Sequence, residues 1–281
     1  MLRFSALGTE VTISGGGQYA AAREVTRLEG LLTRFRPSHL TALNRHGELH
    51  DPPPELVQAV RHALGVSART GGLVTPAVLP ALEAAGYASR PGTFRGEATH
   101  VSDTAAVICT PELIRLPAGM RLDLGGTAKS WIAEQAFGHL HGDGLIDAGG
   151  DVVLRQSAVS AIEIARPFGE SGHLGPLSGP LYLECPPGTW GVATSSKLKR
   201  AWAGGHHLID PRTARPLISP LVQVTVITAH LTDAEVLTKL AFLDPDRLDD
   251  VQGPAQIYAF DHQGRFLKRH EQCWQVTALN L

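Results

Sequence analysis

The chain has little surplus charge and no cluster of basic residues. Its 25 Lys and Arg residues against 27 Asp and Glu residues give a formal net charge of -2 at pH 7. Nucleic acids and anionic membrane surfaces are bound by clustered basic side chains. We therefore expect neither nucleic acid nor a membrane surface among its partners.

Cysteine and long apolar stretches are also scarce. The three cysteines, Cys109, Cys185 and Cys273, are far apart and lack the spacing of metal ligands, which favours a reducing compartment. No apolar run reaches the roughly 20 residues of a membrane-spanning helix. Residues 1–13 alternate like a strand and lack the apolar core of a secretory signal. We predict a cytoplasmic protein that does not insert into a membrane.

Strand-like and helix-like segments follow one another without a regular βα repeat, which favours an α+β fold over a doubly wound sheet. We expect mixed or antiparallel sheets with interleaved helices, in a single domain over residues 1–281 that could be divided into two lobes. The expected helices cover 21–35, 56–67, 127–140 and 234–243. The expected strands cover 2–13, 107–109, 113–116, 122–124, 145–147, 161–164, 181–185, 190–193, 223–228, 256–260, 265–268 and 274–278. A pocket wall at 73–87 and a surface loop at 88–99 complete the expectation.

Residues 121–154 repeat one pattern, in which a short apolar strand ends on a carboxylate and a glycine pair follows. The pairs Gly125-Gly126 and Gly149-Gly150 flank the expected helix at 127–140, and Lys129 lies in the first turn of that helix. Glycine lets the backbone approach a ligand, and a helix N-terminus attracts anions, so the arrangement suits a pyrophosphate. The alternative is that both pairs only make tight turns. The spacing matches neither the Rossmann nor the Walker motif.

A second stretch, residues 192–213, contains two adjacent histidines. Neighbouring residues on a strand point to opposite faces, so His206 and His207 are poorly placed to bind one metal ion. Either could still act as a general base, since the ordinary pKa of histidine lies near working pH. The segment 210–213 has turn chemistry, and it could simply hold the loop.

Taken together, these stretches resemble the FAD:protein FMN transferase (ApbE) family, in the family's own order. The matching segments are 7–9, 35–44, 71–80, 122–129, 145–151, 194–195 and 206–216. The matches to Leu-Asp-Leu-Gly-Gly-x-Ala-Lys and to His-His-Ile-Ile-Asp-Pro-x-Thr-Gly-x-Pro are highly specific. The resemblance implies an ApbE-like fold, binding of FAD, and transfer of FMN to a Thr or Ser hydroxyl of an acceptor protein, with release of AMP.

The resemblance also implies roles for individual residues. His207 would be the base, Asp210 would hold its loop, and Lys129 would balance phosphate charge. The candidate FAD-binding residues, from the glycine pairs and the resemblance, are Gly8, Thr9, Asn44, Asp123, Gly125, Gly126, Thr127, Gly149, Gly150, Asp151, Thr194 and Ser195. The implied magnesium ligands are Glu235 and the backbone carbonyl of the glycine loop at Gly126.

The sequence departs from the family at this metal site. Family members commonly carry Ala-Asp-Ala-Leu-x-Thr on the late helix, with the Asp and Thr oxygens on magnesium. Matching Asp233 to the family Asp leaves Thr238 off the same helical face. The ungapped alignment instead places Glu235 at the Asp and Lys239 at the Thr, and an ammonium cannot bind magnesium. We prefer the second alignment, which predicts weakened or lost metal dependence. Lys239 would then supply positive charge itself or only pair with Glu235.

Two alternatives to the transferase stay open from the sequence. One is a non-catalytic FAD-binding protein that serves as a store, chaperone or regulator. The other is a slow FAD pyrophosphatase.

Overall fold

The computed structural model describes residues 1–87, 100–167, 181–203, 205–250, 255–270 and 273–276. Its helices are α1 (Gln18–Leu32), α2 (His39–His46), α3 (Pro54–Arg69), α4 (Leu79–Ala84), α5 (Ala128–Phe137) and α6 (Leu231–Leu243), with short 3-10 helices η1 (Thr104–Ala106) and η2 (Pro245–Asp250). Its longer strands are β1 (Leu2–Ala6), β2 (Thr9–Gly16), β6 (His141–Ala148), β7 (Val152–Gln156), β8 (Ser160–Ile164), β9 (Leu181–Cys185), β10 (Gly188–Ser196), β15 (Leu221–Thr228), β16 (Gln256–Asp261), β17 (Phe266–His270) and β18 (Cys273–Val276). Its short strands are β3 (Glu48–His50), β4 (Ile108–Cys109), β5 (Leu113–Arg115), β11 (Ala201–Trp202), β12 (Gly205–His206), β13 (Ile209–Asp210) and β14 (Arg215–Pro216). The loop expected at 88–99 and most of the Gly/Pro-rich segment before β9 lie outside the described residues.

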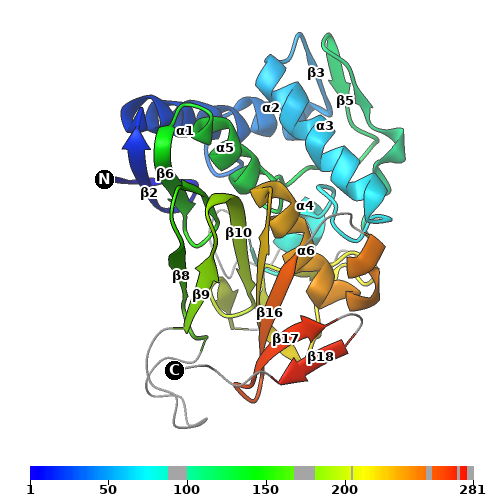
Figure 1. Ribbon diagram of the computed structural model, residues 1–281. Coiled ribbons are helices and arrows are strands. Elements are labelled where there is room, and N and C mark those ends of the chain that lie inside the picture. Colours follow the sequence, from blue (N-terminus) through cyan, green and yellow to red (C-terminus); the bar gives the residue numbers. More distant parts are fainter. Residues whose placement is uncertain (88–99, 168–180, 204, 251–254, 271–272, 277–281) are drawn as a thin grey trace.

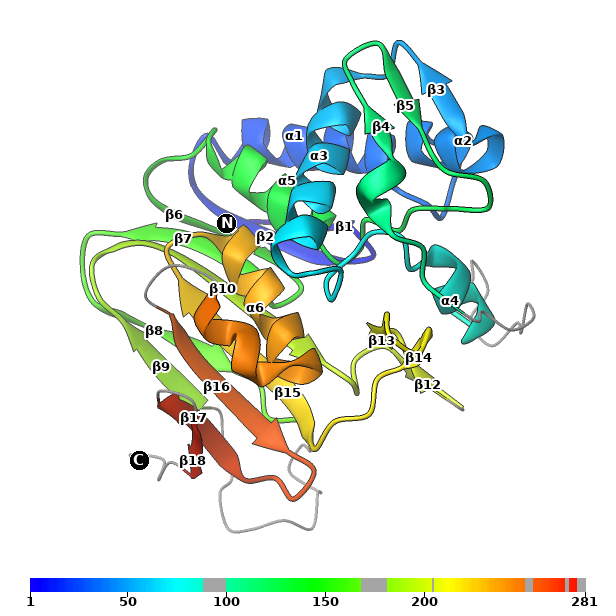
Figure 2. The ribbon, with the colours of Figure 1, turned by 90° about the vertical axis from the view of Figure 1, so that its right-hand side faces the viewer.

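Nine of the described strands build one large antiparallel sheet with helices packed on it, and the other described strands form four smaller sheets (Figure 1). The strand order of the large sheet is β1-β2-β6-β7-β10-β15-β16-β17-β18. Helices α1, α5 and α6 cover one face, with α1 against β1 and β2, α5 against β6 and β7, and α6 against β10 and β15, while α3 packs on α1 and α5 (Figure 2). The expected α+β architecture is confirmed, and every strand pair in the described chain is antiparallel.

The two faces of the sheet pack against different layers. Toward the helices, Val224 and Val226 of β15 join the main hydrophobic core. On the opposite face, Val222 and Ile227 of the same strand join a second cluster that includes the β8–β9 hairpin. Because both faces are covered, all eight residues of β15 are buried. The strand therefore forms a rigid floor beneath the helices.

Apolar periodicity correctly predicted the buried faces of the long helices. In α1 the buried residues are Ala21, Val25, Leu28 and Leu32. The helix was expected to reach Phe35, but it ends at Leu32, since Thr33 takes an extended conformation with ψ 143°. Phe35 is consequently 53% exposed and lies outside the core.

Two expected strands are wrong. The segment 2–13 forms a hairpin, because Leu7 and Gly8 take positive φ values of 57° and 69° and turn the chain back on itself. Residues 122–124 form no strand, although Leu122 and Leu124 are buried. Their segment is held instead by the Asn44 side chain, which bonds the N–H and C=O of Leu122, and by a bond from the Asp123 N–H to the Pro76 carbonyl.

Candidate active site

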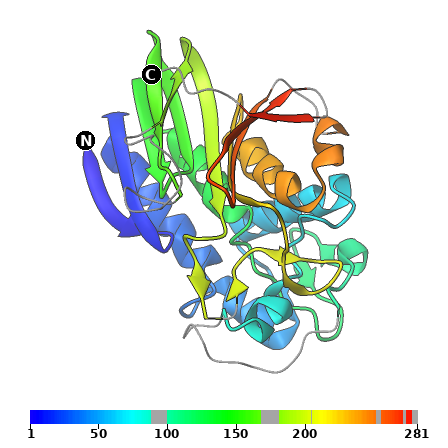
Figure 3. The ribbon, with the colours of Figure 1, turned by 90° about the horizontal axis from the view of Figure 1, so that it is seen from below.

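A cleft opens between the helix layer and the end of strand β10. Its walls come from the 73–87 segment, the start of α5, the β6–β7 turn, the loop before β13, and α6. The 73–87 segment is thus the pocket wall that its apolar sequence predicted. Figures 2 and 3 show α4 beside the β13–β14 ribbon, and Ala81, Leu82, Ile209 and Ala214 pack together there. The predicted site residues that line the cleft are Asp123, Gly125, Gly126, Lys129, Gly149, Asp151, Thr194, Ser195, His207 and Glu235.

The two glycine turns share one device, although their backbones differ. In each, the preceding carboxylate accepts a hydrogen bond from a glycine N–H: Asp123 Oδ1 from Gly125 and Asp147 Oδ1 from Gly150, both at 2.7 Å. Only the second turn needs positive φ, with 72° at Gly149 and 95° at Gly150. The first needs glycine for close approach, because a Cβ on Gly125 would lie 2.8 Å from Asp123 Oδ1.

The backbone N–H groups of Gly125, Gly126 and Thr127 lie near the start of α5, where a phosphate would bind. Two of the three already donate hydrogen bonds within the protein. The Gly125 N–H donates to Asp123, and the Thr127 N–H donates to the Leu124 carbonyl at 2.9 Å. In the described chain, the Gly126 N–H has no such partner. The anion-binding potential at the start of α5 therefore reduces to Gly126 and Lys129.

Lys129 reaches from the first turn of α5 to the end of the sheet. Its Nζ forms an ion pair with Asp151, whose other oxygen accepts a hydrogen bond from the Thr194 N–H at 3.3 Å. Burial alone would lower the pKa of Lys129, but the Asp151 and Glu235 carboxylates raise it above its ordinary value. The lysine is therefore a fixed cation at the base of the cleft.

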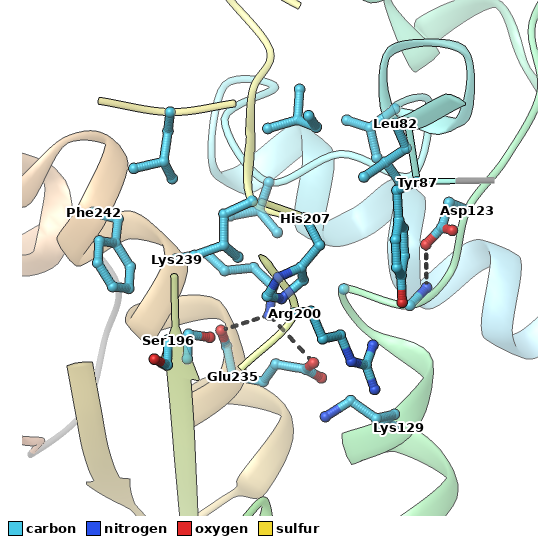
Figure 4. Close-up of a pocket in the computed structure, with 18 of the residues that line it drawn as sticks. Leu82, Tyr87, Asp123, Lys129, Ser196, Arg200, His207, Glu235, Lys239 and Phe242 are labelled. Carbon is cyan, nitrogen blue, oxygen red and sulfur yellow. Dashed lines mark hydrogen bonds and ion pairs between the residues drawn. The ribbon is translucent and has the colours of Figure 1, made fainter. Parts of the chain in front are cut away.

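The structure separates the two adjacent histidines. His206 lies at the end of β12 and is bound to backbone, with Nε2 3.2 Å from the Leu217 carbonyl and Nδ1 accepting from the Leu208 N–H at 3.3 Å. His207 follows that strand and lines the cleft (Figure 4). In the described chain its Nδ1 is buried without a hydrogen-bond partner. Burial, reinforced by nearby Arg200 and Lys239, lowers the pKa of His207 to about 3.

Among the described residues, the Asp210 carboxylate is hydrogen-bonded to Arg212 and not to His207. The carboxylate accepts bonds from the backbone and side chain of Arg212, and Arg212 in turn donates to the Leu243 carbonyl at 2.9 Å. Burial would raise the pKa of Asp210, but these bonds to Arg212 lower it. Asp210 thus fixes the turn that follows the histidine and ties it to the end of α6.

The remaining predicted FAD-binding residues lie around the cleft. Thr9 packs its side chain against Gly149. Gly150, in the same turn, lies next to the Lys199 ammonium. Gly8 lines an adjoining cavity. Asn44 holds the Leu122 backbone from the far side. Thr127 is buried at the start of α5. These residues do not line the cleft themselves, and they contact or adjoin the segments that do.

The residues at the implied magnesium site do not fit a magnesium ion. Lys239 Nζ lies 3.2 Å from both Glu235 Oε1 and the Glu235 carbonyl oxygen, and Ser130 Oγ binds Glu235 Oε2 (Figure 4). Thr238 is turned toward Ser195, 2.8 Å away. Among the described residues, no three His, Cys, Asp or Glu side chains are grouped as metal ligands. An ammonium occupies the position beside the carboxylate where a cation would bind.

The other acidic residue of that helix faces away from the site. Asp233 pairs with Arg69 at 3.0 Å near the surface. Of the acidic residues in the two alignments, Glu235 lines the cleft together with Lys239, whereas Asp233 is not among the lining residues.

Several residues in or beside the cleft received no role in the sequence analysis. Arg34 forms an ion pair with Asp123 and lies over the rings of Phe35 and Tyr87. Tyr87 also stacks on Trp202, with ring centroids 5.5 Å apart. They come from separate segments that only folding brings together. The exposed aromatic at Phe35, just beyond a helix end, was the one local signal.

Two basic side chains next to strand β10 were missed as well. Lys199 and Arg200 line the cleft, and among the described residues neither has a carboxylate partner. Lys199 Nζ would lie 3.1 Å from a Cβ on Gly150, so it covers the second glycine turn. Their adjacency in the sequence was a signal that went unused.

In the part of the chain that the structure describes, no helix combines the length and apolarity needed to cross a bilayer. The fold is shared with the ApbE protein of Thermotoga maritima MSB8, with a TM-score of 0.79 and 21% identity over 96% of each chain. It is also shared with the flavin transferase ApbE of Vibrio cholerae, with a TM-score of 0.76 and 18% identity over 95% of each chain. The structure is thus of the ApbE type.

The sequence comparison agrees with the structural one. The ApbE family model matches residues 7–267. A protein named FAD:protein FMN transferase from Klebsiella pneumoniae (strain 342) is 33% identical over 132 residues, a stretch that covers 44% of this chain and 39% of that protein. The chain belongs to the ApbE family.

Proposed function

We propose that this protein is an FAD:protein FMN transferase, which moves FMN from FAD to the hydroxyl of a Thr or Ser residue on an acceptor protein and releases AMP. The observation that carries the proposal is the cleft itself, where His207 and four basic side chains meet. Membership of the ApbE family and the likeness to the K. pneumoniae protein support the same activity.

The chemistry needs a base and a cationic environment. The acceptor hydroxyl oxygen forms a bond to the FMN phosphorus, and the bond from that phosphorus to the bridging oxygen breaks, so that the electron pair leaves with AMP. The hydroxyl proton passes to His207, which is neutral at working pH because its pKa is lowered to about 3 without a bound anion. The anionic pyrophosphate offsets the positive field of Arg200 and Lys239 and so favours the protonated ring.

The other residues in and around the cleft would bind FAD or hold the site. Lys129, Lys199 and Arg200 would face the phosphates, and Gly126 would offer a backbone N–H. Asp151 and Thr194 would position Lys129, and Asp210 would hold the histidine loop. Free thiols on all three cysteines support a reducing, cytoplasmic location as part of the proposal. The proposed reaction uses no magnesium ion, because the Lys239 ammonium lies against Glu235, the implied magnesium ligand.

The test is incubation of the purified protein with FAD and an acceptor domain, with AMP release and acceptor mass followed together. We expect the acceptor to gain the mass of FMN and the His207→Ala variant to be slower by about 100-fold or more, the usual effect of losing a general base. His206→Gln is the matched control, since its side chain binds only backbone, and it should keep the activity. AMP release without a mass gain would contradict the proposal and identify a pyrophosphatase.

A further inference from the structure

We propose that Lys239 is the resident cation of this site, so that its ammonium group takes the place of a divalent metal ion beside the FAD pyrophosphate. This inference rests on the proposed function, because FAD is the ligand that would use the charge. The inference concerns one side chain of α6, which lines the cleft (Figure 4).

The ammonium is held in place from below. Two of its contacts go to the Glu235 carboxylate and carbonyl oxygens, each at 3.2 Å. An ammonium has three N–H donors and the carbonyl contact is its one hydrogen bond within the described chain, so at least one donor remains for a ligand in the cleft. Glu235 is itself fixed, since it is 3% exposed and its other oxygen binds Ser130. The lysine is therefore a positioned donor rather than a mobile surface cation.

The neighbouring backbone leaves room for this side chain. A Cβ on Gly126 would lie 3.3 Å from Lys239 Cε, so any larger residue there would press on the lysine. The Gly126 N–H has no hydrogen-bond partner in the described chain. A phosphate that met this N–H would also lie next to the ammonium. The first glycine pair and Lys239 thus form one anion site.

Charge in the cleft is balanced for a pyrophosphate without an added metal ion. The cleft is lined by Lys129, Lys199, Arg200 and Lys239 against Asp123, Asp151 and Glu235. Arg34 neutralises Asp123, which leaves the side chains that line the cleft with a net charge of plus two. Both phosphates of the FAD pyrophosphate are anionic, so the fixed cations match them.

The first measurement uses the unaltered protein and Mn²⁺, a spectroscopic stand-in for magnesium. We expect Mn²⁺ titrated into the FAD-loaded protein to give no bound signal by electron paramagnetic resonance. FAD affinity, followed by flavin fluorescence, should be equal with EDTA and with Mg²⁺. Bound Mn²⁺, or FAD binding that requires Mg²⁺, would overturn the assignment.

The second measurement removes the ion pair as a unit. Loss of Lys239 alone would leave Glu235 buried without a partner, so the Glu235→Gln/Lys239→Met double variant is used. We expect FAD affinity in EDTA to fall about tenfold or more, the usual effect of losing a charged hydrogen bond. Lys268→Met is the control, because Lys268 lies over Tyr258, a ring outside the cleft, and should leave affinity unchanged. Unchanged affinity in the folded double variant would refute the role.

The third measurement rebuilds the oxygen ligands of the family. The Glu235→Asp/Lys239→Thr variant should bind Mn²⁺ and should need Mg²⁺ for full FAD affinity. If this variant does not bind Mn²⁺, the Lys239 ammonium is not what keeps a metal ion out of the site. All three readouts measure binding. If the protein transfers no FMN to any acceptor, the proposed function fails while these experiments still decide the role of Lys239.

Discussion

His207 is a buried histidine of the cleft that has two basic side chains, Arg200 and Lys239, near its ring. Its Nδ1 has no hydrogen-bond partner in the described chain, and burial together with Arg200 and Lys239 lowers its pKa from 6.5 to about 3. A histidine that binds a structural carboxylate would show the opposite shift. The local environment therefore keeps the ring neutral.

This pKa shift makes folding stability depend on pH. The folded protein keeps His207 neutral above about pH 3, whereas the unfolded chain binds a proton below about 6.5. Stability that is present above pH 6.5 is thus lost progressively as the pH falls toward 3. We expect the His207→Asn variant, which cannot titrate there, to lose less stability than the wild type between neutral pH and about pH 5. Urea unfolding at the two pH values measures the difference, and parallel losses in both proteins would contradict it.

The residues of the cleft divide into those that sequence could reveal and those that it could not. His207, Lys129 and Glu235 lie within recognisable motifs, and the structure places all three in the cleft. Arg34 and Tyr87 carry no motif, because their positions depend on packing between separate segments. Lys239 was identified through its mismatch with the family pattern, but only the structure shows which atoms it contacts.

At the scale of elements, a buried ion pair joins the segment that follows α1 to the segment that precedes α5. The side chains of Arg34 and Asp123 are 7% and 9% exposed. Asp123 also accepts the Gly125 N–H, so the pair connects α1 to the first glycine turn. Asp123 and Gly125 both line the cleft, so the ion pair holds part of the cleft wall in place.

Breaking this pair should be costly. We expect Arg34→Met to lower the free energy of unfolding by about 3 kcal/mol or more, because Asp123 would stay buried without its partner. Arg36→Met is the matched control two residues away, since Arg36 is 51% exposed and pairs with Glu29 at the surface, where such pairs contribute about 1 kcal/mol or less. Urea unfolding of both variants measures the contrast. Equal effects would show that the buried pair has no special importance.

Helices were easier to predict than irregular segments for a physical reason. The buried faces of α1 and α3 follow the helical period, so burial is visible in the sequence. The segment 122–124 looked like a strand because its leucines are buried, yet its hydrogen bonds go to Asn44 and Pro76. Leu7 likewise gave no local sign of the turn, because a non-glycine residue rarely takes positive φ. Partners far away in the chain decide such cases.

At the scale of the whole molecule, one hydrophobic cluster runs through the helix layer and the sheet. It includes Val11 of β2, Leu28 of α1, Ile132 of α5, Val224 of β15 and Leu240 of α6. Because elements from both halves of the chain share this core, we propose that the protein is a single domain rather than two separable lobes.

A shared core predicts cooperative unfolding. The four tryptophans are Trp131 in α5, Trp190 in β10, Trp202 in β11 and Trp274 in β18, so their fluorescence reports on distant parts of the fold. Far-ultraviolet circular dichroism reports on all helices and strands together. We expect the two signals to change at the same urea concentration, in one transition, because neither the helix layer nor the sheet can keep its apolar face covered without the other. Two lobes with separate cores would give separated transitions, and the cleft between them would then not be a fixed feature of the fold.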